Sequence, residues 1–194
     1  MTRRIAIVQG HPDPAADRLC RALAEAYAEG AIGAGHAVER IEVAALDFPL
    51  LRTKQDFDSG ALPPALHAAQ EAIGRADPLL VVYPLWLGSM PALLKGFFEQ
   101  VFRPGFAFDL SAKGFGVKRL KGKSARIVVT MGMPAFVYRW YFGAHSLKSL
   151  ERNILGFSGF GPIRESLFGM VVAASDDKRR KWLAEMRALG AAAR

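Results

Sequence analysis

The chain has 194 residues and 51% of them are apolar, a composition that suits a folded domain with a large core and excludes a disordered chain. It carries 26 basic and 18 acidic residues, and the resulting net charge of +8 is compatible with nucleic acid, an acidic membrane surface or a phosphorylated cofactor as a partner. No nucleic-acid-binding motif accompanies this charge, so we do not expect nucleic acid as a partner.

Three further features set the expected environment. Cys20 is the only cysteine, which excludes an internal disulfide and favours a reducing cytoplasm. No apolar run reaches the roughly 18 residues that a membrane span needs. Residues 1–5 lead directly into an apolar run without the pattern of a cleavable signal. We therefore expect a single cytoplasmic domain over residues 1–194, without a membrane span.

Apolar runs predict five strands, and the segments between them predict helices. The strands are expected at residues 3–9, 38–43, 79–83, 125–131 and 163–172. The first helix is expected to start near Asp17, a residue type that caps helices, and to end at Gly33 and Gly35. Further helices are expected at residues 63–76, at 91–102, around 147–154, and from a Ser175 cap to Gly190.

Two segments show neither the residue spacing of a strand nor that of a helix. Residues 46–60 show no clean pattern and are expected to form a structured loop. Residues 105–122 are rich in Gly and Lys and are expected to form a small hairpin or a lid that carries Phe106, Phe108 and Phe115.

The alternation of strands and helices predicts an α/β fold with a doubly wound, five-stranded parallel sheet and helices on both faces. The expected strand order is 2-1-3-4-5. In that order the loops at residues 10–14, 84–89 and 130–134 converge at the carboxyl edge of the sheet, where ligands bind in such folds. We expect the functional site there.

The first loop offers an anion site. His11 lies between a strand and a helix, so its imidazole and the free N–H groups of the helix start could bind a phosphate. A turn histidine bonded to the backbone is the equally weighted alternative. The segment lacks both G-x-G-x-x-G and a P-loop sequence, which disfavours a dinucleotide Rossmann site and a P-loop nucleotide site.

The central loop offers a flat apolar surface. Trp86 lies beside the N–H groups of Leu87 and Gly88, a combination that suits a planar heteroaromatic ligand. The alternative is a Trp that only packs under the loop.

Tyr138 and His145 follow the fourth strand and could donate a proton or hydrogen bond to a redox carbonyl. The alternatives are a solvent-facing His145 at a helix start and, for the aromatic run at residues 136–142, a core or dimer-interface role. The four histidines show no metal-ligand spacing, so no metal is expected. Cys20 lies within the first helix, where a small packing role is expected.

The motifs resemble a known family. PLWLG at residues 84–88, followed by PALLKG at 91–96, is similar to the P-x-W…P-A-x-L-K-G signature of the quinone reductase branch of flavodoxin-like flavoproteins. This branch includes DT-diaphorase and the bacterial NAD(P)H:quinone oxidoreductases. Residues 8–11, 103–108 (RPGFAF) and 130–132 resemble its other landmarks, so the similarity extends from the first strand to about Gly169.

The resemblance implies a flavodoxin-like fold and a non-covalently bound flavin, FAD or else FMN, with NAD(P)H as electron donor. The implied phosphate-binding residues are His11, Asp17, Arg18, Leu19 and Cys20. The implied isoalloxazine-binding residues are Pro84, Leu85, Trp86, Leu87, Gly88, Thr130, Met131, Gly132 and Met133.

The same resemblance implies an acceptor site. Tyr138 matches the family's active-site tyrosine and His145 matches the neighbouring histidine to within one position, so both are expected to be catalytic. Phe106, Phe108, Tyr141 and Phe142 are expected to line the substrate pocket for a quinone or another small aromatic acceptor. A homodimer is implied, because the family builds its pocket from two subunits.

Two departures from the family pattern affect the cofactor site. Residues 15–18 (AADR) replace the usual Ser or Thr followed by Asn, which weakens the expected phosphate contacts and leaves FAD versus FMN open. Met133 replaces the second glycine of T-x-G-G, which reshapes the space beside the ring.

We expect a flavin-dependent oxidoreductase that passes hydride from NAD(P)H to a quinone or similar electrophile. The alternative is a regulatory flavoprotein subunit of a membrane transporter, in which the basic clusters and the aromatic run would contact a partner or a membrane. Rapid reduction of the bound flavin by NAD(P)H separates the two.

Overall fold

The computed structural model describes residues 2–109 and 116–194 and contains a five-stranded parallel sheet in the order β2-β1-β3-β6-β7. The strands are β1 (Arg4–Gln9), β2 (Ala37–Glu42), β3 (Leu79–Pro84), β6 (Ala125–Thr130) and β7 (Ile163–Phe168). Counting only these five, the order is the predicted 2-1-3-4-5, and the doubly wound parallel sheet is confirmed. Two short strands, β4 (Phe108–Asp109) and β5 (Val117–Lys118), form a separate antiparallel pair.

Helices fill the connections. They are α1 (Leu19–Gly33), α2 (Lys54–Ser59), α3 (His67–Arg75), α4 (Ala92–Val101), α5 (Ala135–Trp140), α6 (His145–Lys148) and α7 (Asp176–Ala191). Two short 3₁₀ turns, η1 (Val43–Ala45) and η2 (Pro64–Leu66), and a π-helix, η3 (Ser149–Gly156), complete the set. None of the described helices is both long enough and apolar enough to traverse a bilayer.

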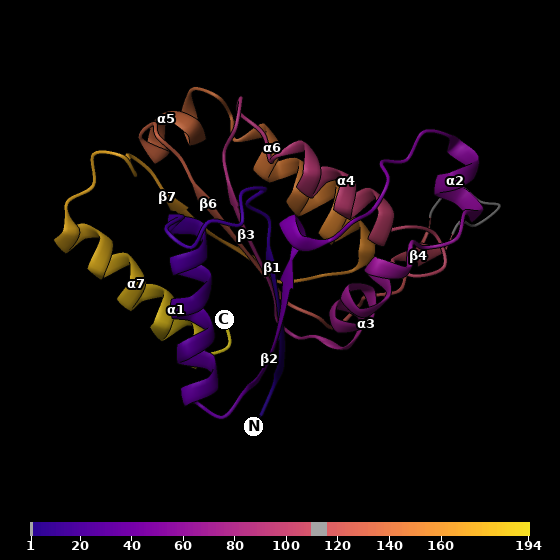
Figure 1. Cartoon of the computed structure of the whole chain (residues 1–194), viewed down its shortest axis with the longest axis horizontal. Coiled ribbons are helices and arrows are strands. Elements are labelled where there is room, and N and C mark those ends of the chain that lie inside the picture. The colour runs from indigo at the N-terminus through magenta and orange to yellow at the C-terminus, as the bar shows by residue number, and fades with distance from the viewer. Residues whose placement is uncertain (1, 110–115) are drawn as a thin grey trace.

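The helices cover the two faces of the sheet as separate layers. Helices α1 and α7 lie together on one face, and α3, α4, α6 and η3 lie on the other (Figure 1). Strands β3 and β6 are buried over their whole length because both faces are covered, whereas the edge strands β2 and β7 are partly exposed.

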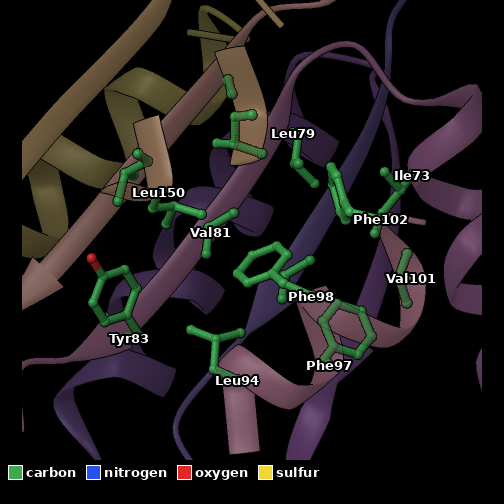
Figure 2. Close-up of a cluster of buried hydrophobic side chains, with 14 of the residues drawn as sticks. Ile73, Leu79, Val81, Tyr83, Leu94, Phe97, Phe98, Val101, Phe102 and Leu150 are labelled. Carbon is green, nitrogen blue, oxygen red and sulfur yellow. The ribbon is translucent and has the colours of Figure 1, made fainter. Parts of the chain in front are cut away.

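Helix α4 anchors the central loop. Leu94 and Phe98 turn toward Val81 and Tyr83 of β3, as Figure 2 shows, and Phe97 packs on the far side of Phe98; all are buried. This apolar face has the helical period that the sequence predicts, and it fixes the position of the loop between β3 and α4.

Helices α1 and α7 pack with their backbones almost in contact. A Cβ atom on Gly30 would lie 1.9 Å from the Arg187 carbonyl oxygen, and one on Gly190 would lie 1.9 Å from that of Tyr27. Gly190 was expected to end α7, but the helix continues to Ala191. The glycine is present because only a residue without a side chain allows this approach.

The structure corrects other element boundaries. Helix α1 starts at Leu19 and not near Asp17, because Arg18 has an extended conformation and occupies the N-cap position. The expected strand at 163–172 ends at Phe168, since Met170 has a positive φ of 57° and turns the chain. The expected loop at 46–60 contains α2, and the expected helix at 63–76 divides into η2 and α3. In the excursion at 105–122, β4 and β5 form the predicted hairpin pairing, while residues 110–115, including Phe115, lie outside the described residues.

Candidate functional site

The three predicted loops meet at the carboxyl edge of the sheet. Strand β3 lies between β1 and β6, so its loop adjoins the other two. The N–H of Gly10 donates to the carbonyl of Val82 at 2.7 Å, and the N–H of Leu85 donates to that of Thr130 at 2.8 Å. These bonds continue the ladder beyond the strands and hold the loops side by side.

His11 has a defined tautomer. The N–H of Asp13 donates to Nδ1 of His11 at 3.0 Å, which requires a lone pair on Nδ1 and therefore places the proton of the neutral ring on Nε2. Burial lowers the pKa of His11 from its ordinary value and outweighs the opposing attraction of the Asp13 carboxylate. At neutral pH the ring is thus a neutral Nε2–H donor.

The loop between His11 and α1 is held by its own charges. Oδ1 of Asp13 accepts the N–H of Ala15 at 2.9 Å, and Oδ2 accepts the guanidinium of Arg18 through Nε at 2.8 Å and Nη2 at 2.5 Å. Asp17 is exposed and lies 3.5 Å from the same guanidinium. Arg18 therefore braces the loop and has no charge left unpaired for a ligand.

The start of α1 offers backbone donors. It has no side-chain cap, and the N–H groups of Leu19 and Cys20 reach no carbonyl oxygen of the described residues. Such groups, together with the helix dipole, favour an anion. Gln9, at the end of β1, has a buried side-chain amide without a hydrogen-bond partner among the described residues.

The central loop is a tight turn. Trp86 and Ser89 exchange two backbone hydrogen bonds of 2.8 and 2.9 Å, and Leu87 and Gly88 between them have φ values of 48° and 75°. Two successive positive φ values are typical of a type I′ turn, which leaves the N–H groups of its two central residues free at the tip. The half-exposed Trp86 ring packs edge-on against the His11 ring, with 5.8 Å between the ring centroids. The first and second loops therefore form one surface.

The third loop is joined to α1 through buried side chains. Sγ of Cys20 lies 3.1 Å from Oγ1 of Thr130, and both residues are buried. Burial raises the pKa of the Cys20 thiol to about 12, despite the hydrogen bond to Thr130, so the thiol stays protonated. The side chain of Cys20 therefore packs in the core, as its place within the first helix suggested.

The remainder of the third loop is hydrogen-bonded to the segment that follows β7. The carbonyl of Met133 accepts the N–H of Met170 at 3.1 Å, and the carbonyl of Met131 accepts that of Val171 at 3.2 Å. Gly132 is exposed between them. This pairing leaves Gly132 as the accessible point of the loop.

Tyr138 does not lie at the surface of this edge. Its side chain is buried, its hydroxyl lies 2.7 Å from Oγ of Ser146, and it accepts the N–H of Leu147 at 3.2 Å. The expected direct contact with an acceptor is therefore not what the structure shows, because the hydroxyl is used to join α5 to α6. His145 is exposed at the first position of α6.

The four aromatic residues expected in the substrate pocket fall into two groups. Tyr141 and Phe142 follow α5 at the carboxyl edge and are exposed. Phe106 and Phe108 follow α4, which returns the chain to the amino edge; Phe106 packs on Phe102 and Phe108 packs on Phe157. Within one chain Phe106 and Phe108 thus lie away from the three loops, because they follow the far end of α4.

Several residues that hold the site carry no motif. Hydrogen bonds of Asp13 hold the first loop, and those of Ser146 hold the α5–α6 junction. Gln9 ends β1 just before the first loop, with a buried amide that has no partner among the described residues. Gln9 could have been singled out as the one polar residue that ends an apolar strand. Between Tyr138 and Ser146 the chain makes a left-handed turn at Gly143 (φ 65°) and Ala144 (φ 49°), for which Gly143 is the only local sequence signal.

A cavity of about 650 Å³ lies between α4, α2 and η3, away from the three loops. Phe98, Phe102, Phe108 and Phe157 line it together with Lys95 and Arg52. It is mainly apolar, and it is the place where the 105–122 excursion meets the helical layer.

Comparisons with known proteins agree with this geometry. A family model described as having a flavodoxin-like fold, Flavodoxin_2, matches residues 3–189. An NAD(P)H oxidoreductase of uncharacterised role from Haemophilus influenzae is 31% identical over 135 residues, which cover 69% of this chain and 66% of that protein. An FMN-dependent NADH:quinone oxidoreductase of Nitratidesulfovibrio vulgaris is 29% identical over 182 residues, 84% of this chain and 83% of that protein.

Solved structures give the same result. The NAD(P)H:quinone oxidoreductase from Methanothermobacter marburgensis superimposes with a TM-score of 0.81 at 25% identity, covering 98% of this chain and 96% of that one. The first six curated relatives are matched over only 46–66% of their own length.

Proposed function

The chain belongs to the Flavodoxin_2 family of flavodoxin-like fold, and on this basis we propose that it is a flavin-dependent oxidoreductase that passes hydride from NAD(P)H to a quinone or a similar electrophile. The observation that carries the proposal is the meeting, at one edge of the sheet, of three sets of donors that have no acceptor among the described residues. These are Nε2 of His11, the N–H groups of Leu19 and Cys20 at the start of α1, and the N–H groups of Leu87 and Gly88 in the central turn.

The residues present fit a flavin. Its phosphate end suits His11 and the N–H groups of Leu19 and Cys20, which supply neutral donors and a helix dipole. Gln9, at the end of β1, adds a buried amide that has no hydrogen-bond partner among the described residues. The braced Arg18 contributes by holding the loop, and Asp17, which is exposed and anionic, contributes through its backbone at most.

The ring end suits the other two loops. Trp86 offers a flat face, and the free N–H groups of Leu87 and Gly88 can bond the edge of a heteroaromatic ring. Pro84 ends β3, and Leu85 leads into the turn and is held by its N–H bond to the Thr130 carbonyl.

Thr130, Met131, Gly132 and Met133 form the neighbouring wall, in which Gly132 is the exposed point. A bound flavin supplies the hydride chemistry, and the protein positions the reactants and polarises them.

The acceptor side is formed by the segment after β6. Tyr141 and Phe142 provide apolar surface that excludes water, and the exposed His145 can donate a hydrogen bond to an acceptor oxygen that gains charge. Tyr138 acts as a positioning residue in this proposal. Its hydroxyl holds Ser146 and Leu147, which follow His145 directly, and so fixes the start of α6.

We further propose a homodimer in a reducing cytoplasm. A second copy of the chain would pack on the aromatic cavity beside Phe108. In that position the residues around its own Phe106 and Phe108 would reach the carboxyl edge of the first subunit's sheet. This arrangement would give Phe106 and Phe108 the expected pocket role from the other subunit.

The identity of the flavin follows from one measurement. The resemblance favours FAD, whereas the N. vulgaris relative is FMN-dependent by name. The absorption spectrum of the purified protein, followed by heat extraction and chromatography of the ligand, identifies flavin and distinguishes FAD from FMN. Rapid bleaching by NADH or NADPH and reoxidation by menadione are then expected. A protein that stays colourless after incubation with both flavins contradicts the proposal, and slow reduction in a yellow protein favours the transporter-subunit alternative.

A further inference from the structure

The fold leaves the side-chain amide of Gln9, the last residue of β1, without a hydrogen-bond partner. The residue is 4% exposed, and neither Nε2 nor Oε1 is bonded to any of the described residues. An amide buried in this way costs the folded chain free energy, because it has given up its bonds to water. A polar group kept at such a cost points to a partner that the chain by itself does not supply.

The side chain of Gln9 lies on the α1 side of the sheet. Successive side chains of a strand point to opposite faces. In β1, Ile5 and Ile7 pack in the apolar cluster that includes α1. Ala6 and Val8 pack in the other cluster, which includes α4. Gln9 continues the series of Ile5 and Ile7, so its amide is directed toward α1 at the carboxyl end of the strand.

The first turn of α1 lies across the end of β1. On one side, Nη2 of Arg21 donates to Oε2 of Glu42, at the end of β2, at 2.7 Å. On the other side, Sγ of Cys20 lies 3.1 Å from Oγ1 of Thr130, at the end of β6. Strands β1 and β3 lie between β2 and β6. The turn that makes both contacts therefore lies above Gln9.

The same turn carries backbone donors that are also unpaired. The N–H groups of Leu19 and Cys20 have no acceptor among the described residues, and they form the positive end of the helix dipole. An unpaired buried amide thus lies beneath an unpaired helix start. Each feature indicates the same kind of ligand, an anion with several acceptor oxygens.

Both cations of this turn already have partners. Arg18 is paired with Asp13, and Arg21 is paired with Glu42. An anion at the helix start is therefore bound mainly by neutral N–H groups. In such a site one additional donor makes a large difference, because no free cation compensates for its loss.

We propose that Gln9 is a phosphate-binding residue, whose side chain rotates when a phosphate group occupies the start of α1 so that Nε2 donates to a phosphate oxygen. In the structure the amide is screened from solvent, so it reaches the site only by this rotation. The rotation exchanges an unpaired amide for a hydrogen bond to a charged acceptor. The inference rests on the proposed function for the identity of the ligand, since the flavin phosphate is expected at this helix start.

A purely structural role does not account for Gln9. An apolar side chain of the same length would fill the space without the cost of an unpaired amide. Gln100, near the end of α4, is the contrasting case. It is also buried, but its Nε2 donates to the carbonyl of Pro49 at 2.7 Å and so joins two segments of the fold.

Ligands that differ only in the phosphate test the proposal. FMN and riboflavin share the ring and the ribityl chain, and only FMN carries the phosphate group. Gln9→Met replaces the amide by an apolar chain of similar length. We expect it to weaken FMN binding by roughly tenfold to a hundredfold, the value of a hydrogen bond to a charged group, and to leave riboflavin binding unchanged. Titration calorimetry measures both affinities, and Gln9→Leu should give the same pattern.

Inorganic phosphate tests the site without a flavin. It should raise the thermal midpoint of the flavin-free parent relative to chloride at equal ionic strength, and it should raise that of Gln9→Met less. Without any ligand, Gln9→Met should be at least as stable as the parent, because it removes an unpaired buried amide. Gln100→Met is the matched control: it should lower the midpoint and leave FMN and phosphate binding unchanged.

Three results overturn the proposal. The first is equal FMN affinity of the parent and Gln9→Met, and the second is an equal loss for FMN and riboflavin, which would show that Gln9 shapes the loop. The third is a Gln9→Met protein that is clearly less stable than the parent before any ligand is added, because the amide then has a partner in the core. A parent that binds phosphate through Gln9 but binds no flavin rejects only the proposed reaction. FMN binding that does not depend on Gln9 rejects this inference alone.

Discussion

At the scale of single residues, the site depends on hydrogen bonds that set protonation and position. The N–H of Asp13 fixes the tautomer of His11, and burial keeps that ring neutral. Buried Cys20 stays a thiol for the same reason, since a charge is costly where water is excluded. In the proposed site, neutral donors of this kind would bind an anion without a free cation.

The lowered pKa of His11 predicts a pH-dependent stability. The unfolded His11 binds a proton near pH 6.5, whereas the folded ring resists it, so unfolding takes up protons below that pH. The free energy of unfolding of the parent should therefore fall relative to His11→Gln as the pH is lowered from about 7.5 to about 5.5. Denaturant titrations of flavin-free protein at several pH values measure the difference. A difference that does not change with pH would show that burial does not govern this ring.

Tyr138→Phe tests the positioning role. The change leaves the Leu147 N–H and the Ser146 hydroxyl without this partner in the core, so the free energy of unfolding should fall by about 1–3 kcal/mol. Tyr141→Phe, at an exposed position, should stay within about 0.5 kcal/mol of the parent.

Turnover separates positioning from direct contact. If Tyr138 acts through the start of α6, Ser146→Ala should lower kcat for menadione in the same direction as Tyr138→Phe. A Ser146→Ala variant with the parent's kcat beside an inactive Tyr138→Phe would mean that the tyrosine hydroxyl itself reaches the acceptor.

At the scale of elements, glycines mark where the chain requires an unusual conformation or a close approach. Gly88 has a φ of 75°, and a Cβ at this position would meet no atom within 4 Å, so its requirement is conformational. Gly30 is needed for close packing and not for its backbone conformation, because it lies in a regular helix and faces the Arg187 carbonyl. The two cases give different predictions.

Gly88→Ala should lower the free energy of unfolding by about 1–2 kcal/mol, the cost of a left-handed conformation for a residue with a Cβ. Gly132→Ala in the next loop is the matched control, since Gly132 also has open space around it but no positive φ. It should be neutral or slightly stabilising. Guanidinium unfolding curves measure both, and equal losses would argue against the turn geometry at Trp86–Ser89.

Gly30→Ala should be among the most destabilising changes in α1. Its methyl group would overlap the α7 backbone, and overpacking of a fixed backbone costs about 1–3 kcal/mol or more. Gly33→Ala, at the end of the same helix and with open space around it, should instead stabilise by up to about 1 kcal/mol. Thermal unfolding of the two variants should therefore shift in opposite directions; a neutral Gly30→Ala would mean that α7 does not pack on α1 as described.

At the scale of the whole molecule, one cavity marks the surface of the proposed dimer. The 650 Å³ cavity beside α4 and η3 is lined by Phe98, Phe102, Phe108 and Phe157, together with Arg52, Lys95 and Glu99. We propose that a second copy of the chain packs on this surface.

The proposed dimer predicts a mass of twice 21.1 kDa in sedimentation equilibrium. Phe157→Asp places a charge on the wall of the cavity, where Phe157 is partly exposed beside Phe108, and should yield a monomer. Ile32→Asp, on the α1 layer, should leave the mass unchanged. Far-UV circular dichroism confirms that both variants are folded, and a dimeric, folded Phe157→Asp variant would place the interface elsewhere.

The amino-acid sequence by itself determined the layered fold. The continuous apolar runs of the central strands, the helical spacing on α4, and the Gly and Pro breaks after β1, β3 and β6 predicted a parallel sheet with helices on both faces. The strand order, and with it the edge where the loops meet, came from the order 2-1-3-4-5 that is common in doubly wound folds, and the structure has this order. These signals are local, since they arise from the period of each element and from residues that cannot continue it. The resemblance of PLWLG and PALLKG to a flavoprotein signature pointed to the same edge.

Only the tertiary structure decided which side chains face that edge. The burial of Tyr138, the location of Phe106 and Phe108 beyond the far end of α4, and the start of α1 at Leu19 each depend on contacts between residues distant in the chain or on the turn that precedes them. The pairing of Cys20 with Thr130 joins residues 110 positions apart. Local periodicity carries no information on such contacts, because they are fixed by how the layers pack and not by the pattern within any one element.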